Sequence, residues 1–436
     1  MPALALQQTV DLLALQAAFP TRYPVLLETG GSTGWDILLA LPQQVEQFDA
    51  GAAHQVFEQL ASHWHEEQCA PAPDLNHLPF RGGWFVYLSY ELLHALEPSV
   101  AVHTVTHGFP YATVMRIPAA LMVDKISHTT WLFAENDAYL AVMQHSVANL
   151  PCADWPSWQL ESLVEEDEQI FTAGVAAIQH YIRAGDVFQV NLSRRWRGLI
   201  SAGTTPCMLF RALRRANPAP FSGVARLNTR QSVISSSPER LVSVRAGRVS
   251  TRPIAGTFAR HANPEHDAQI KLDLLAHPKE RAEHVMLVDL ERNDLGKVCQ
   301  PGSVQVESLM GVSSYAFVHH IESIISGTLQ ADKTPIDVLR ALFPGGTITG
   351  CPKVRTMQLI QQLENSPRGA YTGSMGYINR DGDMDMNILI RSIMLDGQRI
   401  QFSAGAGIVA DSDPQRELQE TRAKALGMMR ALESTT

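Results

Sequence analysis

Alternating hydrophobic and polar residues predict strands near the C-terminus of the chain. The segments 370–379, 384–395 and 399–410 alternate in this way, and Asp-Gly pairs at 381–382 and 396–397 separate them. Asp-Gly between two alternating segments is a strong hairpin signal. We therefore expect an antiparallel meander in which residues 384–395 form the second strand.

Other segments carry the apolar spacing of helices or the alternation of strands. Helices are expected over 171–184 and 278–292, after Pro352, and from Asp413-Pro414 onward. Further strands are expected over 25–31, 80–93 and 187–196, with a hairpin turning at Ala246-Gly247. This interleaving predicts an α+β fold of mainly antiparallel β-sheets with helices packed outside, rather than a doubly wound sheet.

A helix followed by a connection rich in Pro and Trp is expected over 135–158. Such a connection is typical of a boundary between structural units. We expect an N-terminal subdomain over 1–160 and a second domain over 161–436.

The composition is that of an ordinary globular protein: 45% of the 436 residues are hydrophobic and 18% are charged. The net charge of −9 argues against a nucleic-acid partner, which requires a basic face. No apolar run has the length of a transmembrane helix, and no basic leader precedes an apolar block at the N-terminus, so neither a membrane nor a signal peptide is expected. The five scattered cysteines form no CxxC pair, which favours a reducing compartment and a cytoplasmic location.

A glycine-rich run precedes the helix expected after Pro352. It reads Pro-Gly-Gly-Thr-Ile-Thr-Gly-Cys-Pro-Lys over 344–353. The first amides of a helix lack internal partners and the helix dipole favours negative charge there, so such a turn can bind an anion. A tight loop before a core helix is the alternative, and the run alone leaves both open.

Two pairs of glutamates have the spacing that places both side chains on one helix face: Glu280 with Glu283, and Glu417 with Glu420. Single pairs of this kind usually lie on a solvated surface. Two pairs flanked by apolar residues can also converge on a divalent cation, and Mg²⁺ suits a few carboxylates completed by waters and substrate oxygens. Spacing alone does not decide between these interpretations.

Arg391 lies within the strand expected over 384–395, on the same face as Asp385 and Asn387. An arginine inside an apolar strand is costly unless it is paired. It either pairs with an internal acid or clamps a carboxylate ligand through two hydrogen bonds.

Several other residues have both a plain and a chemical interpretation. Residues 405–410 match the dinucleotide fingerprint G-x-G-x-x-A, but no helix follows directly, so Gly405 and Gly407 are interpreted as points of close approach by a ligand. His320 can be a core histidine and Lys424 a surface lysine. Glu239 can be an exposed acid, or a general acid if burial raises its pKa.

Taken together, the segments from Gln169 onward resemble the chorismate-utilising enzymes, which include anthranilate synthase component I, aminodeoxychorismate synthase component I and the isochorismate and salicylate synthases. The similar motifs are, in order, GDVFQVNLSRR, SSSPERL, RPIAGT, KERAEHVMLVDLERNDLGKV, HHI, FPGGTITGCPKVR, GSMGYI, MDMNILIRS, AGAGIVADS and RELQETRAKA. The N-terminal part is similar more weakly, through LLET and PFRGGWFVYLSYE. The resemblance implies that 161–436 is the chorismate-binding catalytic domain.

The resemblance also implies roles for particular residues. A first set would hold Mg²⁺: Glu283 and Glu420, with Glu280 and Glu417 beside them. A second set would take part in catalysis: Glu239 assisting loss of the ring hydroxyl, His320 near the reacting ring, Gln189 and Thr257. A third set would line or bind chorismate and its carboxylates: Gly256, Thr257, Tyr377, Arg391, Gly405, Ala406, Gly407 and Lys424.

Position 189 separates the members that use water from those that use ammonia. Isochorismate and salicylate synthases carry a lysine base here, whereas this chain has Gln189, as the ammonia-using members do. Because glutamine takes no proton near neutral pH, the resemblance favours ammonia as the nucleophile. A separate glutamine amidotransferase subunit is the implied source, since the chain shows no Gly-x-Cys-x-Gly elbow.

The sequence has features of both ammonia-using classes. GDVFQVNLS, GGTITGCPK and MDMNILIRS are more similar to aminodeoxychorismate synthase, which makes 4-amino-4-deoxychorismate for 4-aminobenzoate and folate. Ala255 points to anthranilate synthase, because many of the former enzymes have a lysine there as a proposed nucleophile. The motifs favour the folate branch, with anthranilate synthase as the alternative. Some relatives hold tryptophan near the segment matching LLETGG, and Glu28 argues against that here.

Overall fold

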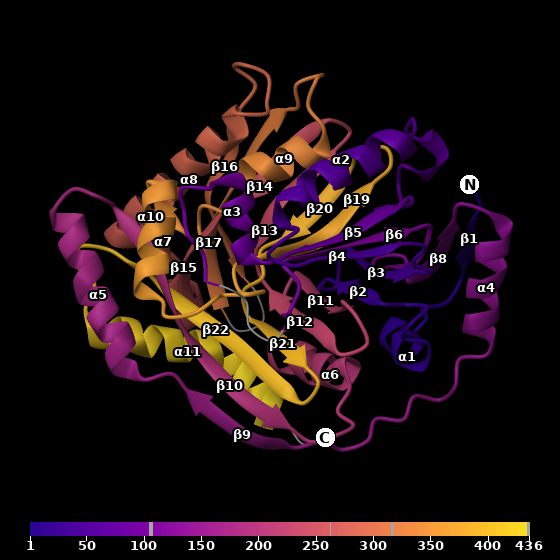
Figure 1. Cartoon of the computed structure of the whole chain (residues 1–436), viewed down its shortest axis with the longest axis horizontal. Helices are drawn as coiled ribbons and strands as arrows, with labels where there is room; N and C mark the ends of the chain where they lie inside the picture. The colour runs from indigo at the N-terminus through magenta and orange to yellow at the C-terminus, as the bar shows by residue number, and fades with distance from the viewer. Residues whose placement is uncertain (104–107, 262, 315–317, 434–436) are drawn as a thin grey trace.

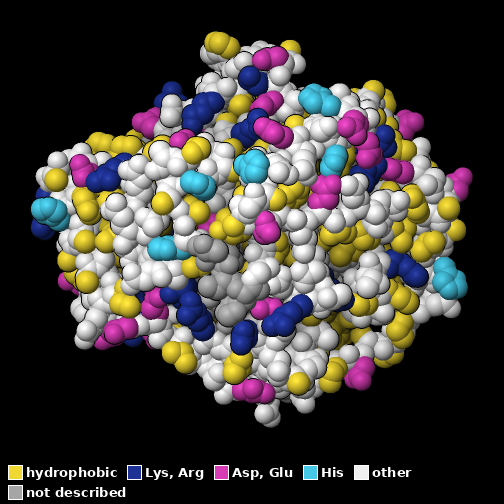
Figure 2. Space-filling view, viewed as in Figure 1, with side chains coloured by type: hydrophobic (Ala, Val, Ile, Leu, Met, Phe, Trp, Pro, Cys, Tyr) yellow, Lys and Arg dark blue, Asp and Glu magenta, His cyan; other side chains and the backbone are white. Residues whose placement is uncertain are grey.

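The computed structural model describes residues 1–103, 108–261, 263–314 and 318–433, without the side chains of Thr257, Ala259, Lys279 and Val318. The described strands form two large antiparallel sheets, with helices mostly at the periphery (Figure 1). This confirms the predicted α+β fold. On the face shown in Figure 2, basic and acidic side chains are interspersed.

The first sheet contains twelve of the described strands. In spatial order they are β1 (Ala3–Leu6), β8 (Thr129–Ala134), β7 (Ala119–Asp124), β3 (Trp35–Ala40), β2 (Val25–Glu28), β11 (Phe221–Arg226), β12 (Gln231–Ser237), β21 (Ser392–Asp396), β22 (Arg399–Ile408), β10 (Gln189–Ile200) and β18 (Gly350–Cys351), with β9 (Leu160–Glu165) also paired to β10.

The second sheet contains ten of them. Their order is β15 (Ile254–Ala259), β17 (Val318–Thr328), β14 (Arg248–Arg252), β13 (Arg240–Arg245), β20 (Met384–Asn387), β19 (Ser374–Asn379), β5 (Gly83–Leu88), β6 (Ala112–Ile117) and β4 (Val45–Phe48), with β16 (Gln305–Ser314) also paired to β17.

Clusters of buried hydrophobic side chains hold the sheets and helices together. One cluster joins side chains of both sheets, such as Ile37 of β3 and Phe85 of β5, so the sheets pack face to face. A second lies between the first sheet and α1 (Leu12–Ala18), α6 (Pro206–Ala216) and α11 (Pro414–Glu433). A third lies between the second sheet and α2 (Val56–Glu67), α8 (Pro278–Gly296) and α9 (Pro335–Leu342).

The remaining helices are α3 (Leu93–Leu96), α4 (Asp137–Ala148), α5 (Glu168–Arg183), α7 (Pro264–Ala276) and α10 (Lys353–Leu363). The five helices predicted from the sequence are present as α4, α5, α8, α10 and α11. Asn136 caps α4 through its side chain, and proline occupies the first turn of α8. Within the described ranges, none of the helices combines the length and the apolar character needed to cross a bilayer.

Both sheets combine strands from before and after residue 160. Strand β2 pairs with β11 in the first sheet, and β5 pairs with β19 in the second. Segments 1–160 and 161–436 therefore contribute strands to the same two sheets. The proposed domain boundary near residue 160 stays a prediction.

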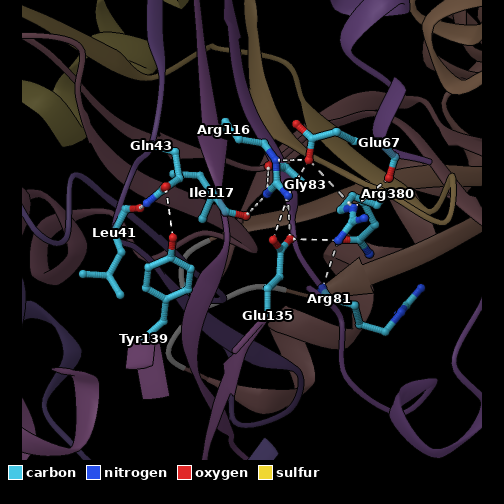
Figure 3. A network of polar contacts seen from close by, with 11 residues as sticks. Leu41, Gln43, Glu67, Arg81, Gly83, Arg116, Ile117, Glu135, Tyr139 and Arg380 are labelled. Carbon is cyan, nitrogen blue, oxygen red and sulfur yellow. Dashed lines mark hydrogen bonds and ion pairs between the residues drawn. The ribbon is translucent and has the colours of Figure 1, made fainter. Parts of the chain in front are cut away.

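A network of ion pairs fastens the N-terminal strands to the turn after β19. Arg116 of β6 donates to both carboxylate oxygens of Glu135, over 2.7 and 2.8 Å, and to Glu67 over 2.7 Å. Arg380 approaches the same Glu135 carboxylate at 3.4 Å. Figure 3 shows the two arginines reaching Glu135 from β6 and from the turn after β19. Segments that lie far apart in the sequence are joined here by charge.

The meander predicted over 370–410 is wrong in its middle. Both hairpins exist, because β19 pairs with β20 and β21 pairs with β22. However, β20 belongs to the second sheet and β21 to the first, so residues 388–391 cross between sheets. Arg391 has φ of +52°, a left-handed conformation that ends the extended run. Alternation continues through this break, and it therefore suggested a single strand.

Candidate active site

The candidate site lies where two stretches of chain cross between the sheets. Glu239 connects β12 to β13, and Arg391 connects β20 to β21. The crossings are joined by backbone hydrogen bonds, from Ile388 N–H to the Glu239 carbonyl over 3.0 Å and from Ser236 N–H to the Arg391 carbonyl over 3.1 Å. Topology thus places the predicted acid next to the predicted arginine.

The Glu239 carboxyl group is buried, with 5% of the residue exposed. Burial raises its pKa to about 7, and the nearby Thr347 hydroxyl, the backbone N–H of Ile254 and the Arg391 and Lys424 cations offset part of that rise. Its Oε1 atom has no hydrogen-bond partner among the described residues. A carboxyl group of this kind is partly protonated at neutral pH and can deliver a proton.

Arg391 is half-buried. Burial lowers its pKa, and the charge of Glu239 opposes this change. A cation in such surroundings is stabilised by an anionic ligand. The structure is therefore compatible with the clamp interpretation of Arg391, and the charge of Glu239 acts on its guanidinium.

His320 on β17 is buried and neutral. Its Nδ1 atom lies 3.3 Å from the Gly256 carbonyl oxygen. A carbonyl only accepts, so Nδ1 carries the proton and Nε2 carries the lone pair. Burial, with a contribution from the Arg391 charge, lowers the pKa of the ring to about 3. His320 is therefore suited to accept a hydrogen bond near neutral pH, and Glu239 is the better proton donor.

Gln189, Glu283 and Gly407 form a tight contact between β10, α8 and β22. The Gln189 Nε2 atom donates to Glu283 Oε1 over 2.5 Å. A Cβ atom at Gly407 would lie 2.2 Å from Gln189 Nε2 and 3.1 Å from Glu283 Oε1, so glycine is required there. The Gln189 Oε1 atom is buried and has no hydrogen-bond partner within the described ranges.

Gly405 is a second point on β22 where other side chains come close to the backbone. It lies two residues before Gly407, on the same face of the strand. A Cβ atom there would lie 2.6 Å from Asn191 Oδ1 and 2.7 Å from the Tyr371 hydroxyl. The Asn191 Oδ1 atom is also buried without a described hydrogen-bond partner. Sequence reasoning missed Asn191 and Tyr371. Asn191 could have been found, because it follows Gln189 at the two-residue spacing that keeps side chains on one strand face.

Tyr377, which the resemblance placed with the substrate, is not brought to this group. Its ring packs in the core between the sheets, 5.7 Å from the ring of Phe80 between centroids. Burial raises the pKa of its hydroxyl. Tyr371, six residues earlier, supplies the hydroxyl at the site instead.

Two other expected residues, Ala406 and Thr257, lie on β22 and β15. Ala406 lies between the two glycines of β22, but its side chain belongs to a hydrophobic cluster with Leu192 and Ile408. The backbone of Thr257 pairs with that of His320, while the side chain of Thr257 lies outside the described part of the structure.

Lys424 on α11 ties that helix to β22. Its Nζ atom donates to the Gly405 carbonyl over 3.0 Å and forms an ion pair with Glu420 Oε1 at 2.7 Å. On α8, Glu280 Oε2 would lie 3.0 Å from a Cβ atom at Gly256, whose φ is +64°. The α8 carboxylates therefore approach Gly256 and Gly407, whereas Glu420 of α11 is linked to Gly405 through Lys424.

In the described structure, the four glutamates expected to bind Mg²⁺ are not gathered into one metal-binding group. Glu417 is buried and Glu420 is largely exposed, while Glu283 contacts Gln189. Among the described residues, no three acidic, histidine or cysteine side chains are already gathered as a metal-binding group. The four glutamates are nevertheless all oxygen donors on the two helices flanking the site.

Comparison of the sequence with known proteins identifies its family. The sequence model described as chorismate binding enzyme matches residues 23–430. The chain belongs to this family. The predicted resemblance is thereby confirmed.

Individual relatives divide by name between two activities. The anthranilate synthase component I-like protein of Synechocystis sp. is 39% identical over 362 residues, covering 82% of this chain and 74% of the relative. The aminodeoxychorismate synthase component 1 of Bacillus subtilis is 47% identical over 267 residues, covering 61% of this chain and only 56% of the relative. The crystal structure of anthranilate synthase component I from Streptococcus pneumoniae matches with a TM-score of 0.81 at 31% identity, covering 90% of this chain and 92% of that one.

Proposed function

We propose that this chorismate-binding enzyme is component I of an aminodeoxychorismate synthase. It would replace the ring hydroxyl of chorismate with ammonia to give 4-amino-4-deoxychorismate, the precursor of 4-aminobenzoate in folate synthesis. The observation that carries the choice of ammonia is Gln189, an amide that contacts Glu283 where water-using relatives need a base. The motifs around residues 187, 347 and 386 favour this product over anthranilate.

Glu239 has the environment required of the acid. Its raised pKa leaves a proton available near neutral pH. That proton passes to the ring hydroxyl, which leaves as water, and ammonia forms the new C–N bond. The proton that the attached nitrogen loses returns to the Glu239 carboxylate. Chorismate and ammonia are thus converted into 4-amino-4-deoxychorismate and water.

Other residues bind and orient the reactants. Arg391 and Lys424 are cations close enough to Glu239 to lower its pKa, and they suit the carboxylates of chorismate. The free acceptor of Gln189, its buried Oε1, can hold an N–H of ammonia. Preplaced charges and acceptors of this kind stabilise charge that develops as the hydroxyl leaves.

Mg²⁺ fits the chemistry of the flanking glutamates. It binds through few carboxylates and retains waters and substrate oxygens, so a complete protein cage is not needed. Glu283 and Glu420 would hold the ion, with Glu280 and Glu417 beside them. When bound, Mg²⁺ would fix a carboxylate of chorismate and neutralise its charge.

Anthranilate synthase component I is the second candidate, and Ala255 favours it. Ala255 is buried on β15, and its methyl group cannot form the adduct proposed for the lysine of many aminodeoxychorismate synthases. In that case the chain would also eliminate pyruvate. Under the first candidate, ammonia must attack without a lysine adduct.

The ammonia would come from a separate glutamine amidotransferase subunit, as the name component 1 of relatives suggests. The choice of nucleophile can be tested without that subunit, by supplying ¹⁵N-ammonium to the purified chain with chorismate and Mg²⁺. Mass detection should show product containing ¹⁵N and no product in its absence. Turnover of chorismate to a hydroxylated isomer without ammonium would contradict the proposal.

A further inference from the structure

Arg368 is a buried arginine whose five N–H protons all meet acceptors. It lies in the turn between α10 and β19, and only 2% of it is exposed. The guanidinium donates to Glu364 Oε2 (2.8 Å) and Oε1 (2.6 Å), the Ile348 carbonyl (3.1 Å), the Thr372 hydroxyl (3.2 Å) and the Asn191 carbonyl (2.7 Å). Arginine has five such donors in a fixed plane, so the match is complete.

The surroundings leave the guanidinium in one orientation. It lies over the rings of Tyr90 and Tyr371, at 4.6 and 5.5 Å from their centroids. The Glu91 carboxylate also accepts from the backbone N–H of Arg368 over 2.7 Å and of Gly369 over 3.0 Å. Both the side chain and the backbone of Arg368 are therefore held.

Two of the acceptors belong to residues next to the proposed chorismate surface. The Asn191 backbone is held through its carbonyl, and the Asn191 side chain ends beside Gly405. Thr372 directly follows Tyr371, whose hydroxyl ends at the same place, and Thr372 has a left-handed φ of +62°. One guanidinium thus fixes the two chain segments that present polar atoms at Gly405.

The third acceptor belongs to the glycine-rich run. Ile348 follows Thr347, whose hydroxyl lies near the Glu239 carboxyl group. The run was expected either to bind an anion or to form a tight loop. Its hydrogen bond to Arg368 links it to the same support as Asn191 and Tyr371.

We propose that Arg368 is a positioning residue, which sets the placement of the Asn191 amide and the Tyr371 hydroxyl against chorismate at Gly405. This inference rests on the proposed function, because it takes the surface at Gly405 as part of the chorismate site. Arg368 acts only through these neighbours. Lysine keeps the charge but has three donors around one nitrogen, so it cannot hold the four groups together.

The test is a double-mutant cycle on Arg368→Lys and Tyr371→Phe, measured both by titration calorimetry of chorismate with Mg²⁺ and by kcat and KM. Arg368→Lys should remain folded by circular dichroism and lose about 100-fold in kcat/KM, the scale expected for misplaced groups. Tyr371→Phe should weaken chorismate binding clearly in the wild-type chain. It should weaken binding much less in the Arg368→Lys chain, because the hydroxyl is already misplaced there.

A purely structural Arg368 would give a different pattern. Stability would fall, but the effects of the two substitutions on chorismate binding would multiply, and that result would overturn the proposal. Arg355→Lys is the matched control, because Arg355 lies on α10 and pairs with Asp186 at 3.1 Å in a partly exposed position. Its kcat/KM should stay within twofold of wild type.

A milder variant covers the case in which Arg368→Lys does not fold. Thr372→Val keeps the shape of the side chain and removes only one acceptor. It should lower the effect of Tyr371→Phe on chorismate binding, and full independence of the two substitutions would again overturn the proposal. Coupling in chorismate binding with anthranilate as product would leave this inference intact and remove only the proposed function. An aminated product that keeps its enolpyruvyl group, with no coupling between the two substitutions, would support the proposed function and overturn this inference.

Discussion

The Gln189 amide donates to the Glu283 carboxylate over 2.5 Å, so strand β10 and helix α8 meet at the site. The residue proposed to select ammonia over water thus touches a glutamate proposed to bind Mg²⁺. Under the proposed function, this contact would link the choice of nucleophile to the placement of the ion.

Gln189→Lys should introduce a base beside Glu283. Once Mg²⁺ offsets the Glu283 charge, the lysine can lose its proton and activate water. With chorismate and Mg²⁺ but no ammonium, the variant should release a hydroxylated isomer of chorismate, detected by chromatography with mass detection. Gln189→Met, which has no base, is the control. If Gln189→Lys gives only aminated product with ammonium and nothing without it, residue 189 does not select the nucleophile by itself.

Glu239→Gln should abolish proton delivery while keeping the shape of the buried group. Loss of a general acid costs about 10²–10⁴-fold in rate. The thermal midpoint should not fall, because the amide removes a buried ionisable group. Activity within tenfold of wild type would exclude Glu239 as the acid.

The pH profile gives an independent check on Glu239. Its pKa is raised to about 7 and the protonated form is required, so kcat/KM should fall as pH rises through about 7. The profile of kcat/KM reports groups of the free enzyme, for which this pKa applies. A kcat/KM that stays level from pH 6 to 9 would be inconsistent with the role assigned here.

Glu420→Ala should abolish Mg²⁺-dependent turnover and leave the fold intact. Its side chain is 44% exposed, so its loss creates no buried cavity. The measurement is activity against Mg²⁺ concentration, with circular dichroism as the check on folding. Glu433→Ala, an exposed change on the same helix, should behave as wild type. Unchanged Mg²⁺ dependence in Glu420→Ala would remove the metal assignment.

Arg116→Met should weaken the network that joins β6 to the turn after β19. It leaves the Glu135 carboxylate, 16% exposed, without its closest cation. Breaking a buried pair costs about 3 kcal/mol or more. The urea midpoint should fall accordingly, whereas Arg292→Met, at the exposed pair with Asp289, should change stability by less than about 0.5 kcal/mol. Equal effects of the two variants would show that the network adds little stability.

Local patterns in the sequence predicted α4, α5, α8, α10, α11 and both Asp-Gly hairpins correctly, because caps, turns and periodicity depend on neighbouring residues. They did not predict which strands pair over long distances, such as β2 with β11. They also missed the crossing at 388–391, since alternation continues through it and no Gly or Pro marks it. The strand pairings show the change of sheet, and the left-handed backbone at Arg391 marks where it occurs.

At the candidate site too, local motifs predicted some residues, whereas others depend on the path of the chain in three dimensions. Motifs identified Glu239, Arg391 and the two glycines of β22, and the structure brings these together. The position of Tyr377 in the core and of Tyr371 beside Gly405 depends on the path of the chain between the sheets, which a motif does not contain. Arg368 carried no signal, because its importance comes from acceptors on three separate segments.

The central claim is the identity of the product, and a lyase-coupled assay tests it directly. The purified chain is incubated with chorismate, Mg²⁺ and ammonium, with and without aminodeoxychorismate lyase, and the products are separated by chromatography with mass detection. We predict an aminated product that keeps its enolpyruvyl group and becomes 4-aminobenzoate only with the lyase. Anthranilate formed without the lyase would contradict the account and place the enzyme in tryptophan synthesis.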